Sequence, residues 1–169
     1  LNDQAIAASY LLRHNLVKKV LVIDLDVHQG NGTAQIFEND KRVFTFSMHG
    51  EHNYPLRKVK SDLDVGLPDG ISGQHYLSLL DENLPQLLQD VNPDFIFYQS
   101  GVDILDTDKL GRLGVNIEDC KRRDEKVLRL AYENSVPVVA CMGGGYSKEI
   151  KYIVEAHANT YRLAKDIWE

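Results

Sequence analysis

The sequence predicts an α/β fold of three layers, in which helices cover both faces of a parallel β-sheet. Short runs of apolar, β-branched or aromatic residues predict the strands, because continuous apolar character is typical of strands buried on both faces. These runs are residues 20–23, 43–46, 95–98 and 136–140. Helical patterns lie between or after them, at residues 33–38, 72–89, 117–133 and 148–168. This alternation indicates right-handed crossovers between parallel strands.

A further helix is predicted at the start of the chain, where Asn2 or Asp3 can cap an apolar pattern that reaches Leu12. Residues 49–70 interrupt the alternation with scattered glycines, prolines and charges. We expect them to form a functional loop or a poorly ordered one. No repeat or linker divides the sequence, so residues 1–169 are predicted to be one domain or part of one.

The composition argues against two classes of partner. The 169 residues carry a net charge of -6, and no long basic run is present, so we expect no nucleic-acid partner. No basic leader or membrane-length apolar run is found either, which predicts a cytoplasmic protein without a membrane partner. Cys120 and Cys141 are far apart and fit neither a Cys-x-x-Cys site nor a disulfide scaffold.

The end of the first predicted strand carries the most informative residues. In an extended chain, side chains two residues apart share a face, so Asp24, Asp26 and His28 are expected to point the same way. Asp103 follows the strand at 95–98 and would join them if the two strands are neighbours. Two aspartates and a histidine would then face one divalent metal ion with an open coordination position.

The glycine run at 143–145 follows the last predicted strand and could bring backbone close to a ligand. Tyr146 comes directly after it and could donate a hydrogen bond to a substrate oxygen. The same run could instead bind a phosphate, although it lacks the Gly-x-Gly-x-x-Gly and Walker patterns.

Each candidate also has a structural interpretation. Asp103 could cap a helix or lie in a turn, Asp24 could support ligands without binding metal, and His28 could be a partly buried histidine. Other histidines and aspartates are scattered. His49 and His52 could line a pocket or lie in a solvated loop, whereas surface, packing or turn positions are expected for His75, His157, Asp62, Asp64 and Asp69.

Four motifs, in order over nearly the whole chain, resemble the zinc-dependent histone deacetylase superfamily. They are Asp-Leu-Asp-Val-His-Gln-Gly-Asn-Gly-Thr at 24–33, Phe-Thr-Phe-Ser-Met-His at 44–49, Ser-Gly-Val-Asp at 100–103 followed by Asp-Lys-Leu-Gly at 108–111, and Gly-Gly-Gly-Tyr at 143–146. Residues 47–55 and 61–69 look most like the bacterial and class IV branch. The resemblance implies an arginase/deacetylase-like fold whose N-terminal part is missing from this chain.

The resemblance assigns roles to individual residues. It implies zinc ligation by Asp26, His28 and Asp103, and polarisation of the acyl carbonyl by Tyr146. Fe²⁺ or Co²⁺ could also occupy such a site. Supporting roles are implied for a further set: Asp24 behind a catalytic histidine, Asp24 and Ser47 beside a K⁺ or Na⁺ ion, Asn31 where some members have an orienting aspartate, and Tyr54 and Gly144 in the substrate channel.

The implied reaction is the removal of acetyl or another acyl group from an acylated lysine, a polyamine or another acylated small molecule. Family members use a tandem His-His pair as general base, and this chain contains no adjacent histidines. The chain resembles the C-terminal part of a catalytic domain, so we expect it to be crippled or inactive on its own. Uncovered apolar surface also predicts self-association into a homo-oligomer.

Two alternatives to a zinc deacetylase stay open from the sequence. One is a ureohydrolase-like enzyme that binds two manganese ions, although its pattern does not match the motif at 24–33. The other is a non-catalytic domain that binds acylated ligands or protein partners through residues 49–70. The number of metal ions per chain and the binding of a hydroxamate distinguish these possibilities.

Overall fold

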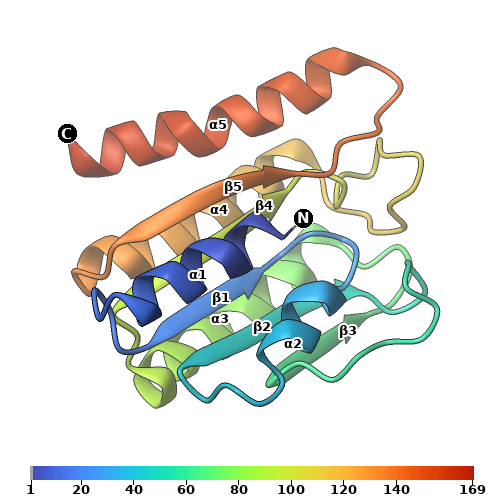
Figure 1. Cartoon of the computed structure of the whole chain (residues 1–169). Coiled ribbons are helices and arrows are strands. Elements are labelled where there is room, and N and C mark those ends of the chain that lie inside the picture. The colour runs from blue at the N-terminus through green and yellow to red at the C-terminus, as the bar shows by residue number, and fades with distance from the viewer. Residues whose placement is uncertain (1) are drawn as a thin grey trace.

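The computed structural model describes residues 2–169, which form one parallel sheet flanked by helices (Figure 1). The elements are α1 (Asp3–Arg13), β1 (Val20–Asp24), α2 (Asn31–Phe37), β2 (Val43–Gly50), β3 (Leu63–Leu67), α3 (Gly73–Val91), β4 (Phe95–Gly101), α4 (Ile117–Glu133), β5 (Val138–Gly143) and α5 (Ile150–Trp168). The sheet has the strand order β3-β2-β1-β4-β5, and every neighbouring pair is parallel. The predicted α/β class and parallel sheet are confirmed.

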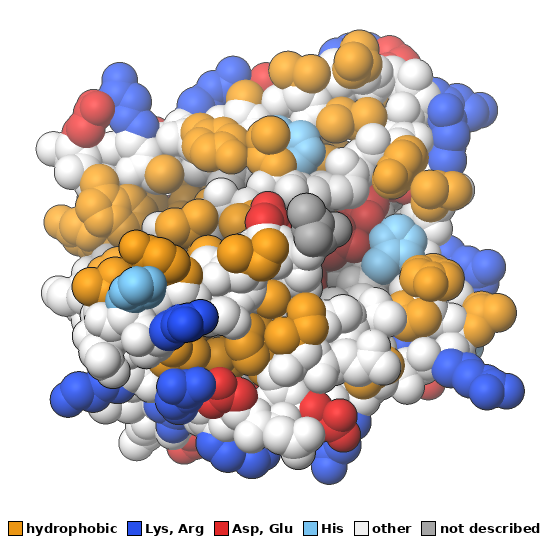
Figure 2. Space-filling view, viewed as in Figure 1, with side chains coloured by type: hydrophobic (Ala, Val, Ile, Leu, Met, Phe, Trp, Pro, Cys, Tyr) orange, Lys and Arg blue, Asp and Glu red, His pale blue; other side chains and the backbone are white. Residues whose placement is uncertain are grey.

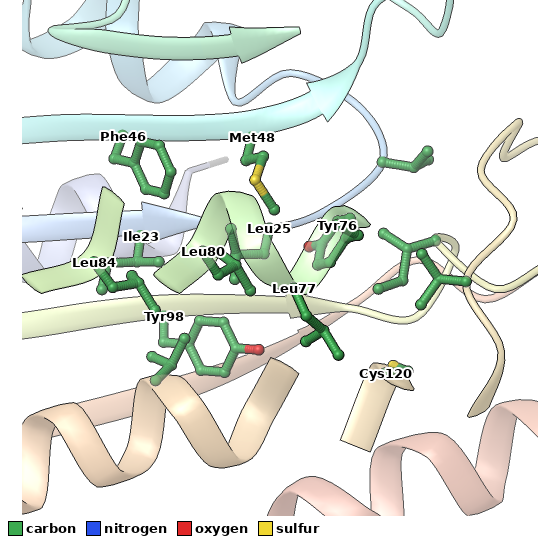
Figure 3. Close-up of a cluster of buried hydrophobic side chains, with 14 of the residues drawn as sticks. Ile23, Leu25, Phe46, Met48, Tyr76, Leu77, Leu80, Leu84, Tyr98 and Cys120 are labelled. Carbon is green, nitrogen blue, oxygen red and sulfur yellow. The ribbon is translucent and has the colours of Figure 1, made fainter. Parts of the chain in front are cut away.

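Helices cover both faces of the sheet, as the continuous apolar runs predict. On one face, α1 and α2 pack over Val20 and Val22 of β1. On the opposite face, α3 and α4 pack over Leu21 and Ile23 of the same strand, and α5 lies against α4 (Figures 1 and 3). Successive β1 side chains therefore enter different cores, and each buried aliphatic side chain contributes about 1.5–3 kcal/mol.

Local capping explains where several helices begin. The Asn2 side chain accepts a hydrogen bond from the Ala5 amide at 2.9 Å, so the predicted cap of α1 is Asn2. Asn116 accepts from the Asp119 amide at 2.8 Å and begins α4, whose bounds match the predicted 117–133. Ser72 caps α3 in the same way. These local signals lie in the sequence itself, which is why the helices are predicted well.

The prediction of a loop over residues 49–70 is wrong in part. β2 continues to Gly50, and Leu63–Leu67 forms the edge strand β3. β3 alternates half-buried and exposed residues and contains an aspartate and a glycine, so it lacks the apolar run that reveals the buried strands. The predicted strand at 136–140 is also displaced, since β5 spans Val138–Gly143.

Topology brings the predicted chemistry to one edge of the sheet. β1 lies between β2 and β4, with Asp24 paired in register with both Ser47 and Gln99. The carboxyl ends of β1, β2, β4 and β5 consequently meet at the same edge, where ligands of open α/β sheets bind.

Within residues 2–169, no helix is both long and apolar enough to cross a membrane.

Candidate metal centre

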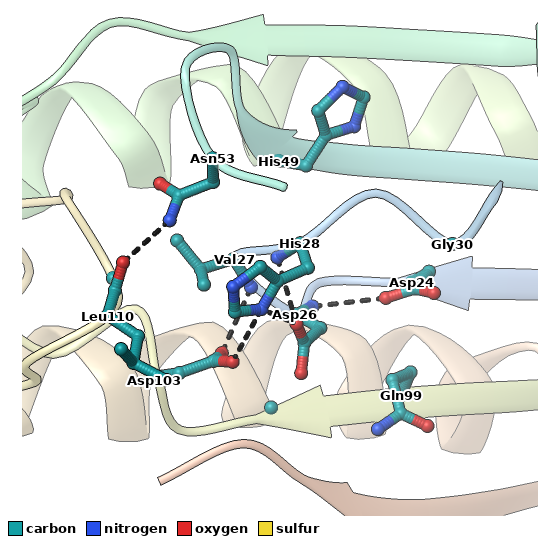
Figure 4. Close-up of polar contacts among 12 residues, drawn as sticks. Asp24, Asp26, Val27, His28, Gly30, His49, Asn53, Gln99, Asp103 and Leu110 are labelled. Carbon is teal, nitrogen blue, oxygen red and sulfur yellow. Dashed lines mark hydrogen bonds and ion pairs between the residues drawn. The ribbon is translucent and has the colours of Figure 1, made fainter. Parts of the chain in front are cut away.

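Asp26, His28 and Asp103 converge at the carboxyl edge of the sheet (Figure 4). One potential ligand atom from each lies within 4.8 Å of the others. Nδ1 of His28 lies 3.1 Å from Asp26 Oδ1 and 3.1 Å from Asp103 Oδ2. The two carboxylates and the imidazole are therefore arranged around one point, as a site for a single ion requires.

The segment that carries Asp26 and His28 is a bend, because β1 ends at Asp24. The predicted alternation continues through the bend, since Leu25 and Val27 are fully buried while Asp26 and His28 are partly exposed. The expectation of an extended chain from Asp24 to His28 is thus wrong in its backbone detail. Burial of the two apolar side chains nevertheless turns the two polar ones toward the same side.

Asp103 is held rigidly in this cluster. Its side chain is 1% exposed, and its Oδ1 accepts a hydrogen bond from the Val27 amide at 3.0 Å (Figure 4). This bond joins the turn after β4 directly to the bend after β1. The two segments that carry the candidate ligands are therefore fixed relative to one another.

Charges within the cluster perturb one another. Hydrogen bonds to the carboxylates of Asp103 and Asp26 raise the pKa of His28 to about 10. Burial raises the pKa of Asp103, against the hydrogen bond from His28 that favours its charged form. The metal-free cluster consequently holds a proton on the imidazole at neutral pH. A divalent cation can replace that proton as the positive partner of the two carboxylates.

Glycines leave the space around the carboxylates open. A Cβ atom at Gly101 would lie 2.4 Å from Asp26 Oδ2, and one at Gly144 would lie 2.3 Å from the Asp103 carboxyl carbon. Gly144 also has a φ of +63°, a backbone conformation that other residues rarely adopt. Any side chain at these positions would collide with the candidate ligands. The donor set and this close backbone packing together fit a small cation.

Asp24 lies behind the cluster. Its carboxylate accepts a hydrogen bond from the Asp26 amide at 3.1 Å, and burial together with the Asp26 charge raises its pKa well above the usual value. The backbone of Gly30 packs against its other oxygen. Ser47, its partner in β2, is buried and accepts from the Gly30 amide at 3.3 Å. Asn31 is the first residue of α2 and is partly exposed.

Two tyrosines predicted to contact substrate lie in loops near this edge. Tyr146 follows the glycines after β5, and its side chain is 53% exposed. Tyr54 follows β2 and is 70% exposed. The structure thus brings the backbone of the Gly144 segment to Asp103, while both phenol rings lie at the surface. Their predicted roles in the substrate channel stay predictions.

The histidines after β2 do not behave alike. His49 is buried within the end of β2, and its Nδ1 lies 2.9 Å from Ser47 Oγ. Burial lowers the pKa of His49, so this residue packs inside the protein and does not lie in a solvated loop. His52 is exposed, and its Nδ1 lies 3.2 Å from Oδ1 of Asp69.

Several polar residues that surround the site have no functional role predicted from the sequence. The buried amide of Gln29 bonds the backbone of Val59 and also donates to Asp64 at 2.8 Å, so Asp64 is more than a solubilising residue. Arg123 is fully buried beneath the cluster and donates to the carbonyl of Gly101 at 2.6 Å. On a helix such as α4, an arginine usually indicates a solvated face, so no signal in the sequence reveals its burial.

Comparison with known proteins identifies the family. A model of the histone deacetylase domain matches residues 1–161. The chain belongs to the histone deacetylase family. It is 45% identical over 168 residues to an uncharacterized protein of Picosynechococcus sp., covering 99% of this chain and 56% of that protein. It is 36% identical to histone deacetylase 2 of Arabidopsis thaliana, covering 82% of this chain and 36% of that protein.

Two solved structures share the fold of this chain. The HDA15 HD domain superposes with a TM-score of 0.79 at 24% identity, over 98% of this chain and 51% of that one. Acetylpolyamine aminohydrolase from Burkholderia pseudomallei gives 0.82 at 23% identity, over 99% and 50%. The chain therefore spans about half the length of these relatives.

Proposed function

We propose that this chain is part of a zinc-dependent amidohydrolase that removes acetyl or other acyl groups from acylated amines. Membership of the histone deacetylase family supports the reaction class. The convergence of Asp26, His28 and Asp103 at one edge of the sheet is the observation that supports assigning the reaction to these residues. An acylated lysine and an acylated polyamine are the proposed substrates, in keeping with the names of the relatives.

Asp26, His28 and Asp103 would hold the zinc ion, with Nδ1 of His28 as the nitrogen donor. The ion supplies Lewis-acid polarisation of an amide carbonyl and activation of water. Tyr146 would donate its phenolic proton in a hydrogen bond to the acyl oxygen, where negative charge develops during attack. Asp24 and Ser47 would support the site from behind and bind K⁺ or Na⁺.

The general base would come from outside these residues. The six histidines of the chain include no adjacent pair, and the matched relatives are about twice as long. General base catalysis contributes typically about 100- to 10000-fold, so we propose that the chain alone has little or no activity.

Metal analysis of this chain beside a longer form that includes any coding sequence upstream tests the proposal. Both proteins are assayed on an acetyl-lysine peptide and an acetylated polyamine. We expect one zinc ion per chain in both and activity in the longer form. A longer form that binds zinc but hydrolyses neither substrate would contradict the proposal.

The metal count also decides between one-ion and two-ion chemistry. Within residues 2–169, the three-residue cluster is the one group of histidine, cysteine and acidic side chains placed to hold an ion. This favours one zinc over the two manganese ions of a ureohydrolase-like enzyme. Hydroxamate binding that is lost on chelation would show a working metal pocket, whereas absence of both metal and binding would favour a non-catalytic interaction domain.

Zinc binding should release about one proton per ion between pH 6 and pH 8. The pKa of His28 is about 10 in the metal-free protein, so the imidazole is protonated over this range and must lose its proton before Nδ1 can bind metal. The apparent affinity should therefore rise about tenfold per pH unit. Calorimetry in two buffers of different ionisation enthalpy measures the proton count, and His52→Asn, at an exposed position, is the control. A pH-independent affinity would contradict this prediction.

We propose that the chain self-associates through the β5 edge of the sheet. β5 pairs with β4 alone, and its Val139 and Met142 are 43% and 60% exposed. Hydrophobic side chains gather over β5 and α1 in the view of Figure 2. Unpaired edge strands with apolar side chains favour association, and a lysine on the edge opposes it.

Light scattering should therefore show oligomers that Val139→Lys reduces. The same substitution at Leu56, which is 89% exposed but lies in a loop, should leave association unchanged. A monodisperse monomer of the unmodified chain would contradict this prediction.

A further inference from the structure

Residues 105–111, between β4 and α4, lie between two segments that border the candidate site. We call them the 105–111 loop. On one side, the loop meets the turn after β2, where the buried Asn53 donates its Nδ2 proton to the Leu110 carbonyl at 2.8 Å (Figure 4). On the other side, it meets the segment after β5 that carries Tyr146. The 105–111 loop therefore contacts both of the segments that border the site.

The carboxylate of Asp108 makes the contact with the Tyr146 segment. Its Oδ2 accepts a hydrogen bond from the backbone amide of Tyr146 at 2.6 Å. Its Oδ1 accepts from the amides of Leu110 at 2.8 Å and Gly111 at 2.9 Å. Three backbone N–H groups from two segments thus share one side chain, and charged acceptors form the stronger class of hydrogen bond.

The loop is itself fixed to the candidate metal ligands. Gly111 packs so closely on the backbone of Asp103 that a Cβ atom there would lie 1.9 Å from the Asp103 carbonyl oxygen. The amide of Asp106 also donates to the Val115 carbonyl at 2.9 Å. Asp108 consequently joins the Tyr146 backbone to a support that already contacts a ligand-bearing residue.

A second contact acts in parallel. The hydroxyl groups of Thr107 and Ser147 are hydrogen-bonded at 2.8 Å. Adjacent residues of the loop, Thr107 and Asp108, therefore bind adjacent residues of the other segment, Tyr146 and Ser147. This pairing aligns the two segments in one register.

The Asp108 contact adds to the close packing of Gly144 against Asp103 in restraining the Tyr146 segment. Gly144 and Gly145 both have positive φ values, +63° and +106°, and glycine has more accessible backbone conformations than any other residue. The Tyr146 side chain is 53% exposed, so burial contributes little to its placement. Fixing a residue's backbone costs conformational entropy, and the Asp108 contact offsets this cost.

We infer that Asp108 is a positioning residue that fixes the backbone of Tyr146, and through it the phenol, relative to the metal ligands. The inference rests on the proposed role of Tyr146 as the donor to the acyl oxygen. Asp108 does not touch the reacting atoms. Its effect on the reaction is exerted through Tyr146, and this property separates it from a residue that merely stabilises the fold.

Hydrogen exchange measured on the purified protein tests the contact without any activity assay. In Asp108→Asn, one carboxylate oxygen becomes an NH₂ group, so three N–H donors can no longer all be accepted. We expect the Tyr146 amide to exchange about 10- to 100-fold faster, the loss expected for one hydrogen bond to a charged group. Asp106→Asn makes the same change at an exposed position two residues away and should leave this amide unchanged.

A double-mutant cycle in an active longer form tests the consequence for catalysis. Asp108→Asn should lower kcat by about 10- to 100-fold, a range consistent with misplacement of a reacting group by about 1 Å, with KM and zinc content little changed. In the Tyr146→Phe background, the same substitution should change kcat by less than about twofold, because the phenol that Asp108 positions is already absent. An equal loss in both backgrounds would show a general structural role and overturn the inference.

The two experiments separate this inference from the proposed function. An inactive longer form would contradict the deacetylase proposal, while the exchange rate of the Tyr146 amide would still decide whether Asp108 fixes this segment. An unchanged exchange rate in Asp108→Asn would overturn the inference whatever the activity. If Asp108→Asn does not fold, Thr107→Val at an exposed position removes the parallel contact to Ser147, and the Tyr146 amide should again exchange faster; an unchanged rate would overturn the inference that the 105–111 loop fixes this segment.

Discussion

Replacing Tyr146 by phenylalanine should lower the kcat of an active longer form by about 100- to 1000-fold, the usual effect of removing one donor to a developing oxyanion. The substitution deletes a single hydroxyl group. Because the backbone of the segment is held by Asp108 and not by the phenol, the fold should be unaffected. Zinc content should also be unchanged, since the candidate ligands are Asp26, His28 and Asp103.

Steady-state kinetics on an acetyl-lysine peptide measure this effect, with zinc determined in the same samples. Tyr132→Phe is the matched control, because Tyr132 is about equally exposed but lies at the end of α4, in edge-to-face contact with Trp168. We expect the control to retain full activity. Normal turnover in Tyr146→Phe would show that another group stabilises the oxyanion.

The architecture could be predicted because its signals are local. Strands buried on both faces appear as continuous apolar runs, and the helix caps at Asn2 and Asn116 lie next to the helices they begin. The convergence of Asp26, His28 and Asp103 follows from these elements, since neighbouring parallel strands place their carboxyl ends together.

Other features could not be predicted because they depend on contacts between distant segments. β3 is an edge strand whose sequence, Leu-Asp-Val-Gly-Leu, carries no buried run, so its pairing with β2 alone defines it. The role of Asp108 depends on its contact with Tyr146, which lies 38 residues further along the chain. The burial of Arg123 depends on carbonyl groups of β4 and of the bend after β1. Contacts between distant segments of this kind produce no periodic pattern of residues in the sequence.

Replacing Arg123 by methionine should lower the free energy of unfolding by about 3–5 kcal/mol, the usual cost of leaving one member of a buried ion pair without its partner. Arg123 and Asp124 are both fully buried, and their side chains are 2.8 Å apart. The guanidinium group also donates to the carbonyls of Leu25, at 3.3 Å, and Gly101. Methionine has similar length but no charge or donor, so the carboxylate and both carbonyls would lose this partner.

Urea unfolding of the two variants Arg123→Met and Arg122→Met measures the difference directly. Arg122 precedes Arg123 on α4 but is 59% exposed and pairs with Asp119 at 3.5 Å. Surface pairs of this kind contribute about 0–1 kcal/mol, so the control should differ little from the unmodified chain. Equal effects of the two substitutions would contradict the prediction.

A third variant shows whether the cost comes from the unpaired charge. Asp124 accepts hydrogen bonds from Arg123, from Tyr98 and, at 2.7 Å, from Thr160 of α5. In Arg123→Met with Asp124→Leu, neither charge of this buried pair remains, so part of the lost stability should return. The recovery should be incomplete, because the two hydroxyl groups lose their acceptor and each unpaired buried donor costs about 1–3 kcal/mol. A double variant less stable than Arg123→Met would show that Asp124 stabilises the fold more through these hydroxyl groups than through the ion pair.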